Sequence, residues 1–366
     1  MGKPGIYVLL FLTGIWFSAC RNVSKLEEEH IETDSIKYRI VYYIHGDGSY
    51  LYHDNDGNEI QADERMVNQA ISVAEALPNS EVFIFHQKQK KHILFLFPLK
   101  DGEFYYYRNR QLLDNESYNS NASLQNLDIE AAFFREYASY VPDLPDKVVR
   151  NIFLYYGHEI PESGGMGYNS SYPEKPFSVD NLAKALSLFK SATQIGNSKF
   201  DFLLLSTCYN GTPGVIDKLA PYASYIMASP EYLHLSYISS EYLKKLPRKS
   251  QLEDFHAYLK RFAEAAFMRL KEDTRTMITI ALYDADRVKD FLNSYIYAKA
   301  SDRSPQDETG SGRETTIPDD AGCIDCSRES FFDTKAAKQG IDLFYNPPQF
   351  GKYKGKLTHS GWGCPK

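Results

Sequence analysis

Two apolar runs are the strongest indicators of the fold of this chain: residues 148–156 (VVRNIFLYY) and 200–205 (FDFLLL). Each run is short and apolar, which is typical of a strand that is buried on both faces of a parallel sheet. Residues 180–193, which lie between the two runs, carry apolar side chains at helical spacing. A right-handed crossover through this helix makes the two strands parallel neighbours.

The same alternation continues in both directions along the chain. It predicts further strands over residues 38–44, 81–85, 223–228 and 276–282, and further helices over residues 63–77, 128–140, 215–222, 251–271 and 286–299. We also predict a hairpin formed by residues 92–98 and 103–107 around a glycine turn, and a loop over residues 115–126. Strands that alternate with helices indicate an α/β fold with a mostly parallel sheet flanked by helices.

Composition indicates one large globular body. The chain has 366 residues, of which 43% are hydrophobic and 24% charged, and its formal net charge is −7. These values exclude a disordered or fibrous chain, and the acidic balance argues against a nucleic-acid partner, which requires clustered Lys and Arg. We expect one domain over residues 38–300, a mobile loop over residues 301–322, and a C-terminal extension over residues 323–366 that completes the domain.

The first 19 residues have the layout of a secretory signal peptide. Lys3 precedes an apolar run over residues 6–17 (IYVLLFLTGIWF), and Ser18-Ala19 precede Cys20. The run is too short to cross a hydrocarbon core as a helix, which takes roughly 20 residues. The layout resembles a bacterial lipoprotein signal, whose cysteine is acylated; an ordinary signal peptide with a chance cysteine is the alternative. We therefore expect an exported protein in the cell envelope, with residues 20–37 as a polar tether and a lipid on Cys20 that holds it to a membrane, the outer membrane being favoured.

Two reactive side chains follow the two strands that decide the fold. His158 comes two residues after the first strand and Cys208 three residues after the second, each in a glycine-containing loop. Because the carboxyl ends of parallel strands meet at one edge of a sheet, we expect the two side chains to lie close together. A thiol beside an imidazole is a nucleophile–base pair of the kind that attacks carbonyl groups. The alternative is a buried structural cysteine and a hydrogen-bonded core histidine.

The residues around this pair resemble the clostripain family of cysteine peptidases, which share the caspase–gingipain type of α/β fold. The resemblance lies in residues 42–51 (YYIHGDGSYL), 151–168, 200–231, 323–325 and 341–347 (IDLFYNP), and runs on to Trp362. It implies a caspase-like, mostly parallel sheet with a C-terminal α/β extension, and a peptide or protein substrate. It also implies that Cys208 is the nucleophile, that His158 is its base, and that the backbone N–H groups of Cys208 and Glu159 form the oxyanion site.

Two positions depart from the family pattern. The family usually has Gly where this chain has Glu159, and it tends to have Asp where this chain has Ser206. That Asp lines the pocket for a basic side chain at P1, the substrate residue before the cut. We expect Ser206 and Glu159 to line the substrate pocket here, and we leave the P1 specificity open. The alternative is an inactive surface lipoprotein that keeps the peptidase fold as a binding module.

Several other features have weaker functional interpretations. Residues 54–59 (DNDGNE) are similar to a calcium loop, but a carboxylate is lacking at the first position and a hairpin turn explains them better. Some clostripain relatives use Ca²⁺, so the ion stays a candidate cofactor with no site assigned, and we predict no metal site. A disulfide among Cys323, Cys326 and Cys364 is expected after export, with one thiol left over. His45 ends a strand and is assigned a turn or supporting role, and the 28 tyrosines leave a sugar-stacking surface as a further alternative.

Overall fold

The computed structural model describes residues 36–46, 51–53, 57–93, 97–120, 126–139, 149–162, 171–172, 175–192, 199–233, 237–247, 252–273, 277–302, 325–328, 332–351 and 353–364. The chain divides into two compact units, Met1–Ser35 and Ile36–Lys366, and every described residue belongs to the second. The signal peptide, the lipidated Cys20 and most of the tether predicted from the sequence therefore lie outside the described residues. Among the described helices, none combines the length and the apolar character that a membrane span requires.

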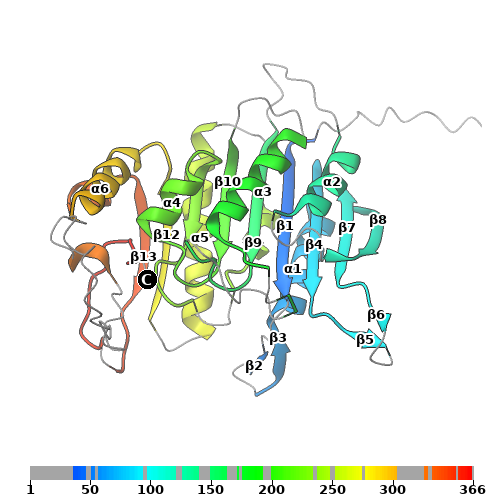
Figure 1. The fold of residues 1–366 in the computed structure, drawn as a ribbon, viewed down its shortest axis with the longest axis horizontal. Helices are drawn as coiled ribbons and strands as arrows, with labels where there is room; N and C mark the ends of the chain where they lie inside the picture. The colour runs from blue at the N-terminus through cyan, green and yellow to red at the C-terminus, as the bar shows by residue number, and fades with distance from the viewer. Residues whose placement is uncertain are drawn as a thin grey trace, which may run out of the picture. The chain divides into compact units, whose positions relative to one another are not determined.

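The described residues form a nine-stranded sheet with the order β13-β12-β11-β10-β9-β1-β4-β7-β8 (Figure 1). Its five central strands are parallel: β11 (Ala223–Ala228), β10 (Phe200–Ser206), β9 (Arg150–Tyr156), β1 (Tyr38–Gly46) and β4 (Ser80–Lys88). Antiparallel strands extend it at both edges, namely β12 (Ile278–Asp284) with β13 (Ile341–Asn346), and β7 (Gly102–Arg108) with β8 (Gln111–Tyr118). Two short antiparallel pairs lie apart from it, β2 (Leu51–His53) with β3 (Glu59–Gln61), and β5 (His92–Ile93) with β6 (Phe97–Pro98).

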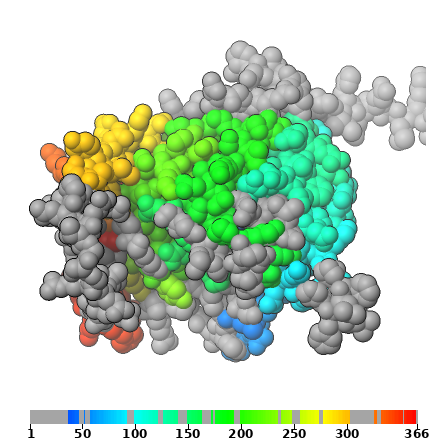
Figure 2. Space-filling model, viewed as in Figure 1, coloured from blue at the N-terminus to red at the C-terminus, as the bar shows by residue number. Residues whose placement is uncertain are grey.

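Helices cover both faces of the sheet, so the central strands are buried throughout. One face carries α2 (Asp128–Tyr137), α3 (Val179–Ala192), α4 (Pro213–Leu219) and α6 (Lys289–Asp302). The other carries α1 (Ala62–Ala76), α5 (Leu252–Asp273) and the short helix η2 (Glu241–Lys245). Figure 2 shows the first face, where residues of α3 and α4, in green, cover the middle of the sheet. Two-sided burial explains why these strands are continuous apolar runs in the sequence.

The predicted α/β class is confirmed, but the prediction for residues 92–126 is wrong in two places. Residues 92–98 do not pair with residues 103–107; β7 pairs instead with β4 and with β8. The first part of the predicted loop over residues 115–126 belongs to β8. This strand lies at the edge of the sheet with mostly exposed side chains, so it has no apolar alternation to detect. Its turn uses Asn109 and Arg110 at φ of 47° and 72°, and an arginine there is an unusual turn signal.

The C-terminal part of the chain belongs to the same core. β13 pairs with β12, and the chain then returns across the end of the sheet as residues 356–364, which we call the C-terminal strap. Trp362 of this strap is fully buried, with its ring 4.7 Å from that of Tyr283 and 5.0 Å from that of Phe291. Its indole N–H donates a hydrogen bond to the carbonyl oxygen of Ala337 at 2.9 Å. The short helices η4 (Cys326–Arg328) and η5 (Ala336–Lys338) lie in this part of the chain.

We expect Trp362→Ala to lower the free energy of unfolding by about 3–5 kcal/mol, because it removes a fully buried indole and leaves a cavity beside Tyr283 and Phe291. Phe350→Ala is the matched control. The Phe350 ring is 72% exposed, so its removal should change stability by less than about 0.5 kcal/mol. Urea unfolding of both variants measures the difference, and equal losses would show that the strap does not share the core.

Candidate active site

Strand register places His158 and Cys208 at the same level of the sheet. β9 and β10 are parallel neighbours in which Tyr156 pairs with Ser206, the last residue of each strand. The backbone N–H of Gly157 donates a further bond, of 3.4 Å, to the carbonyl oxygen of Ser206. His158 and Cys208 each come two residues after the paired positions, and neighbouring strands lie about 4.8 Å apart. The two residues therefore emerge side by side at the carboxyl edge of the sheet.

Cys208 is a half-buried thiol that is not part of a disulfide. Its sulfur accepts a hydrogen bond from the backbone N–H of Leu233 at 3.4 Å, and its side chain packs against the apolar cluster on the α1/α5 face. A backbone N–H directed at sulfur favours the thiolate, which is the nucleophilic form. His158 is exposed and Glu159 half-buried, so the neighbouring loop carries an accessible imidazole and a carboxylate next to it.

The loop that follows Cys208 is held in a tight backbone conformation. Tyr209 has φ of 53°, a left-handed conformation that is unusual for a tyrosine, and its N–H donates to the carbonyl oxygen of Glu231 at 3.0 Å. Gly211 donates to the carbonyl oxygen of Ser229 at 2.9 Å. A Cβ atom at Gly211 would lie 2.6 Å from the Tyr283 hydroxyl, so only glycine fits there.

The pKa of the Tyr209 phenol depends on the charged groups around the site. Burial raises its pKa to about 12, with added contributions from the negative charges of Cys208, Glu231 and Glu159. Tyr209 therefore stays neutral at any working pH. Cys208, Glu231 and Glu159 all lie close enough to Tyr209 to influence its pKa, so the Glu159 carboxylate and the thiol share one neighbourhood.

Ser206 is uncharged, and its hydroxyl is engaged in a hydrogen bond. The side chain is fully buried, and its Oγ accepts a hydrogen bond from the backbone N–H of Ile238 at 2.8 Å. Phenol rings surround this end of the sheet: Tyr156 lies on Tyr42 at 6.2 Å and meets Tyr237 edge-on at 5.7 Å. Burial raises the pKa of both Tyr42 and Tyr156, so these rings are neutral as well. Glu159 is thus the one acidic side chain among the pocket residues predicted from the sequence.

His45 lies on the third strand of the same edge. It is buried at the end of β1, where the pairing of Ile44 with Tyr156 puts it level with Gly157. Its ring stacks on that of Tyr43 at 6.4 Å, and a Cβ atom at Gly157 would lie 3.2 Å from the Cβ of His45. His45 therefore packs behind the strand that carries His158, where a supporting role remains the sequence-based prediction.

Sequence reasoning missed Asn210, which joins the two loops. Asn210 is 1% exposed, and its side chain makes two hydrogen bonds with the backbone of Ile160, two residues after His158. In the sequence, Asn210 stands before a glycine in a loop and has the pattern of an ordinary turn residue. The only sequence signal for Asn210 is its position two residues after Cys208, past the end of a predicted strand.

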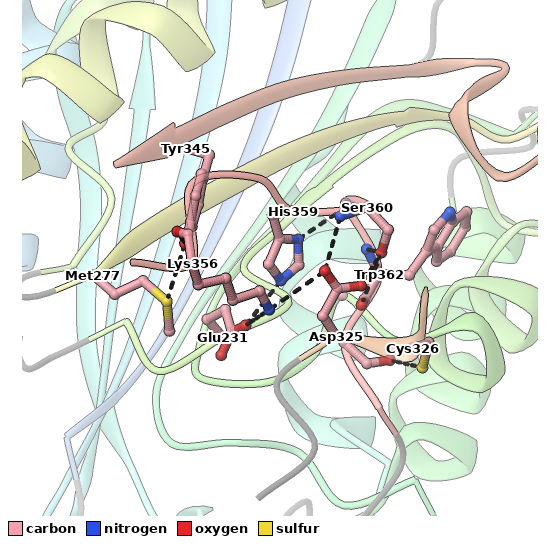
Figure 3. A network of polar contacts seen from close by, with 12 residues as sticks. Glu231, Met277, Asp325, Cys326, Tyr345, Lys356, His359, Ser360 and Trp362 are labelled. Atoms are coloured by element: carbon pink, nitrogen blue, oxygen red, sulfur yellow. Dashed lines mark hydrogen bonds and ion pairs between the residues drawn. The ribbon is translucent and has the colours of Figure 1, made fainter. Parts of the chain in front are cut away.

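A buried polar cluster ties the C-terminal strap to the loop after β11 (Figure 3). Glu231 is 1% exposed, and its carboxylate lies 2.8 Å from Nε2 of His359. Nδ1 of His359 accepts a bond from the N–H of Gly361 at 2.9 Å, so the ring proton is on Nε2 and is donated to Glu231. Burial raises the pKa of Glu231, and the bond from His359 opposes that shift. The cluster was not predicted from the sequence.

The pKa of a second carboxylate of the cluster, Asp325, is shifted downward, opposite to that of Glu231. Asp325 accepts hydrogen bonds from the Ser360 hydroxyl at 2.5 Å and from the Ser327 N–H at 3.0 Å, and Lys356 lies 3.3 Å away. Burial alone would raise its pKa, but these donors and the neighbouring charges lower it to about 2. Asp325 is therefore ionised under all ordinary conditions and anchors the strap to η4.

The strap also contacts the Cys208 loop directly. The N–H of Gly363 donates to the carbonyl oxygen of Gly211 at 2.9 Å, and the Tyr283 hydroxyl donates its one proton to the carbonyl oxygen of Gly361, at 2.6 Å, while lying 3.2 Å from that of Gly211. The Cys326 thiol donates to the carbonyl oxygen of Gly363 at 2.8 Å. The C-terminal extension therefore forms part of the wall behind the candidate nucleophile.

The two described C-terminal cysteines differ in state. Cys326 is a buried thiol, whereas Cys364 is disulfide-bonded. Of the three expected to provide one disulfide and one thiol, Cys326 is thus the thiol, and Cys323 lies outside the described residues. Across the described ranges, no group of three or more His, Cys, Asp or Glu residues is arranged to hold a metal ion. Residues 54–56, in the loop that is similar to a calcium site, lie outside the described residues. The strands that flank this loop pair as the hairpin β2–β3.

Comparison with known proteins identifies the fold. No protein-family model and no curated protein matches this chain. Among solved structures, an inactive zymogen C11 protease from Parabacteroides distasonis is similar over 90% of this chain and 91% of that protein, with a TM-score of 0.55 and 15% identity. Two structures of a secreted C11 cysteine protease from Bacteroides thetaiotaomicron are also similar. The complex with an irreversible peptide inhibitor covers 69% of this chain and 67% of its own (TM-score 0.48, 12% identity), and the structure named iotapain covers 74% and 72% (TM-score 0.47, 14% identity).

The similarity to the zymogen shows that the chain has the caspase-like α/β fold of the C11, or clostripain-type, cysteine proteases. The fold predicted from the clostripain resemblance is confirmed. At 15% identity the similarity concerns the fold. The roles of individual site residues therefore rest on the geometry above.

Asp325→Asn tests the polar cluster through its pH dependence. The folded-state pKa of Asp325, about 2, lies below its ordinary value of 3.8, so its contribution to stability is present above pH 3.8 and is lost as the pH falls toward 2. The shift corresponds to about 2 kcal/mol, and we expect the variant to lose about that much at pH 7. Between pH 4 and 2 its stability should fall less steeply than that of the wild type, in urea unfolding at a series of pH values. Asp290→Asn, at an exposed position in α6, is the control and should leave the acid slope unchanged.

Proposed function

We propose that this chain is an exported cysteine endopeptidase of the clostripain type that acts on peptides or proteins, with Cys208 as nucleophile and His158 as base. The observation that carries the proposal is the register of β9 and β10, which brings a half-buried thiol and an exposed imidazole to one edge of a caspase-like sheet. The N–H···S bond from Leu233 supports the thiolate that such chemistry requires.

In the proposed reaction the Cys208 thiolate attacks the scissile carbonyl carbon, and the carbonyl electron pair moves onto the oxygen. The backbone N–H groups of Cys208 and Glu159 donate hydrogen bonds to this oxyanion. His158, which holds the thiol proton as imidazolium, gives it to the leaving amine as the C–N bond breaks. A water molecule, deprotonated by His158, then attacks the thioester and releases the acid and the thiol.

The localisation is part of the same proposal. The signal-like layout of residues 1–19 supports export, and Cys20 directly after it supports a lipid anchor in the cell envelope. A polar tether over residues 20–37 would let the peptidase domain reach substrates away from the bilayer.

Glu159 supports a second candidate function. Its carboxylate follows His158 directly, where negative charge opposes a developing oxyanion. This observation favours a protein that keeps the fold and the site as a binding module without turnover. The two functions differ in whether Cys208 is needed, so the next experiment separates them.

We expect Cys208→Ala and His158→Ala each to lower peptide hydrolysis by at least about 1,000-fold, because the first removes the nucleophile and the second its proton acceptor. Turnover of a broad peptide library by the purified mature chain is the measurement, together with labelling by an electrophilic peptide. Cys326→Ala is the matched control, since that thiol is fully buried behind the strap. Equal turnover by wild type and Cys208→Ala, with no labelling, would favour the binding module.

Glu159→Gln tests the charge of the substrate pocket. If the Glu159 carboxylate receives a basic P1 side chain, its neutralisation should lower kcat/KM for Arg or Lys substrates by about 10-fold relative to substrates with a neutral side chain of similar length. The neutral substrates serve as the internal control, because the backbone N–H at position 159 is unchanged. A parallel change in both substrate classes would assign the P1 contact to another residue.

A further inference from the structure

Asn210 forms a two-point link between the loops that carry the proposed nucleophile and base. Its Oδ1 accepts a hydrogen bond from the N–H of Ile160 at 3.0 Å, and its Nδ2 donates one to the carbonyl oxygen of Ile160 at 2.7 Å. The side-chain amide thus pairs with the backbone of Ile160 as a neighbouring strand would. Asn210 and Ile160 are both 1% exposed, so neither bond competes with solvent.

The chemistry of the partners fixes the orientation of this amide. Oδ1 also accepts a hydrogen bond from the Thr207 hydroxyl, at 2.5 Å. A rotated amide would direct its NH₂ group at the N–H of Ile160 and its oxygen at the carbonyl oxygen, which would break both bonds. Thr207 and Asn210 lie on either side of Cys208, so the same amide also closes the turn that presents the thiol.

Asn210 continues the strand pairing past the point where the ladder ends. The last ladder bond joins Gly157 to Ser206, one residue before His158 and two before Cys208. The Asn210–Ile160 bonds lie two residues beyond each of them. His158 and Cys208 are therefore enclosed between two fixed cross-links, one formed by backbone and one by the Asn210 side chain.

We propose that Asn210 is a positioning residue that sets the distance and facing of the His158 imidazole relative to the Cys208 thiol. This inference rests on the proposed function, in which the two groups act together. Because Asn210 acts through Ile160 and touches no substrate, its loss should lower kcat and leave KM nearly unchanged. A displacement of about 1 Å at a reacting pair costs about 100-fold in rate, which is the loss we expect for Asn210→Ala.

Alkylation of Cys208 gives a readout that does not depend on peptide turnover. A small neutral reagent, iodoacetamide, reacts with the thiolate, whose population depends on the imidazole. We expect Asn210→Ala and His158→Ala each to slow alkylation of Cys208 at pH 7 by about 10-fold. Peptide mass mapping assigns the label to Cys208 and not to Cys326. The double variant should be no slower than His158→Ala alone, because Asn210 acts only through the imidazole.

Thr212→Ala is the matched control from the same loop. Thr212 caps α4 by accepting a hydrogen bond from the N–H of Val215 at 3.2 Å, so its loss weakens the loop without touching the link to Ile160. It should lower thermal stability and leave kcat and the alkylation rate within about 2-fold of wild type. Asn210→Ser is the second variant if Asn210→Ala does not fold. Its hydroxyl is polar like the amide but lies closer to the backbone and cannot pair with both the N–H and the carbonyl oxygen of Ile160, so it should show the same kinetic loss.

Two results would overturn the inference: wild-type alkylation and kcat in a folded Asn210 variant, or a double variant whose alkylation loss is the product of the two single losses. Failure of the proposed function looks different. In that case the wild type shows no turnover, while alkylation still reports whether Asn210 and His158 act on Cys208 as one unit.

Discussion

The parallel pairing of β9 with β10 is the constraint on which the rest of the site depends. Its register makes Tyr156 and Ser206 the last paired residues, and the placement of His158 and Cys208 follows from counting onward from that pair. Burial on both faces holds this register, since a slip by one residue would move apolar side chains between the two helix layers. The carboxyl edge of the sheet thus carries His158 and Cys208 on neighbouring connections.

The C-terminal strap supplies support that the sheet edge lacks. Loops past strand ends have no ladder partners of their own, and here the strap provides them, with Gly363 bonded to Gly211 and His359 bonded to Glu231. The buried charges of Glu231 and Asp325 are compensated by donors from the strap itself. Removing a donor would leave a buried carboxylate with less compensation, which couples the strap to the Cys208 loop.

The end of the sheet around Ser206 is built from phenol rings. Around Ser206, where the clostripain resemblance leads one to expect an acidic residue, the chain places Tyr42, Tyr156 and Tyr237. Burial raises the pKa of Tyr42 and Tyr156, so these two fully buried rings stay protonated and uncharged. Part of the unusual tyrosine content of the chain therefore has a location in the structure, at this end of the sheet.

Hydrophobic periodicity was enough to predict the βαβ core, the five parallel strands and the positions of His158 and Cys208 at strand ends. The reason is that strands buried on both faces have continuous apolar sequences. Periodicity could not determine β8, whose exposed side chains leave no periodic pattern. Nor could it determine the partners of Asn210, Glu231 or Asp325, which pair with residues far away in the chain. A polar residue in a loop has the same local pattern whether water or a distant backbone group satisfies it. Only the tertiary structure, which removes the water, decided that these side chains hold the site together.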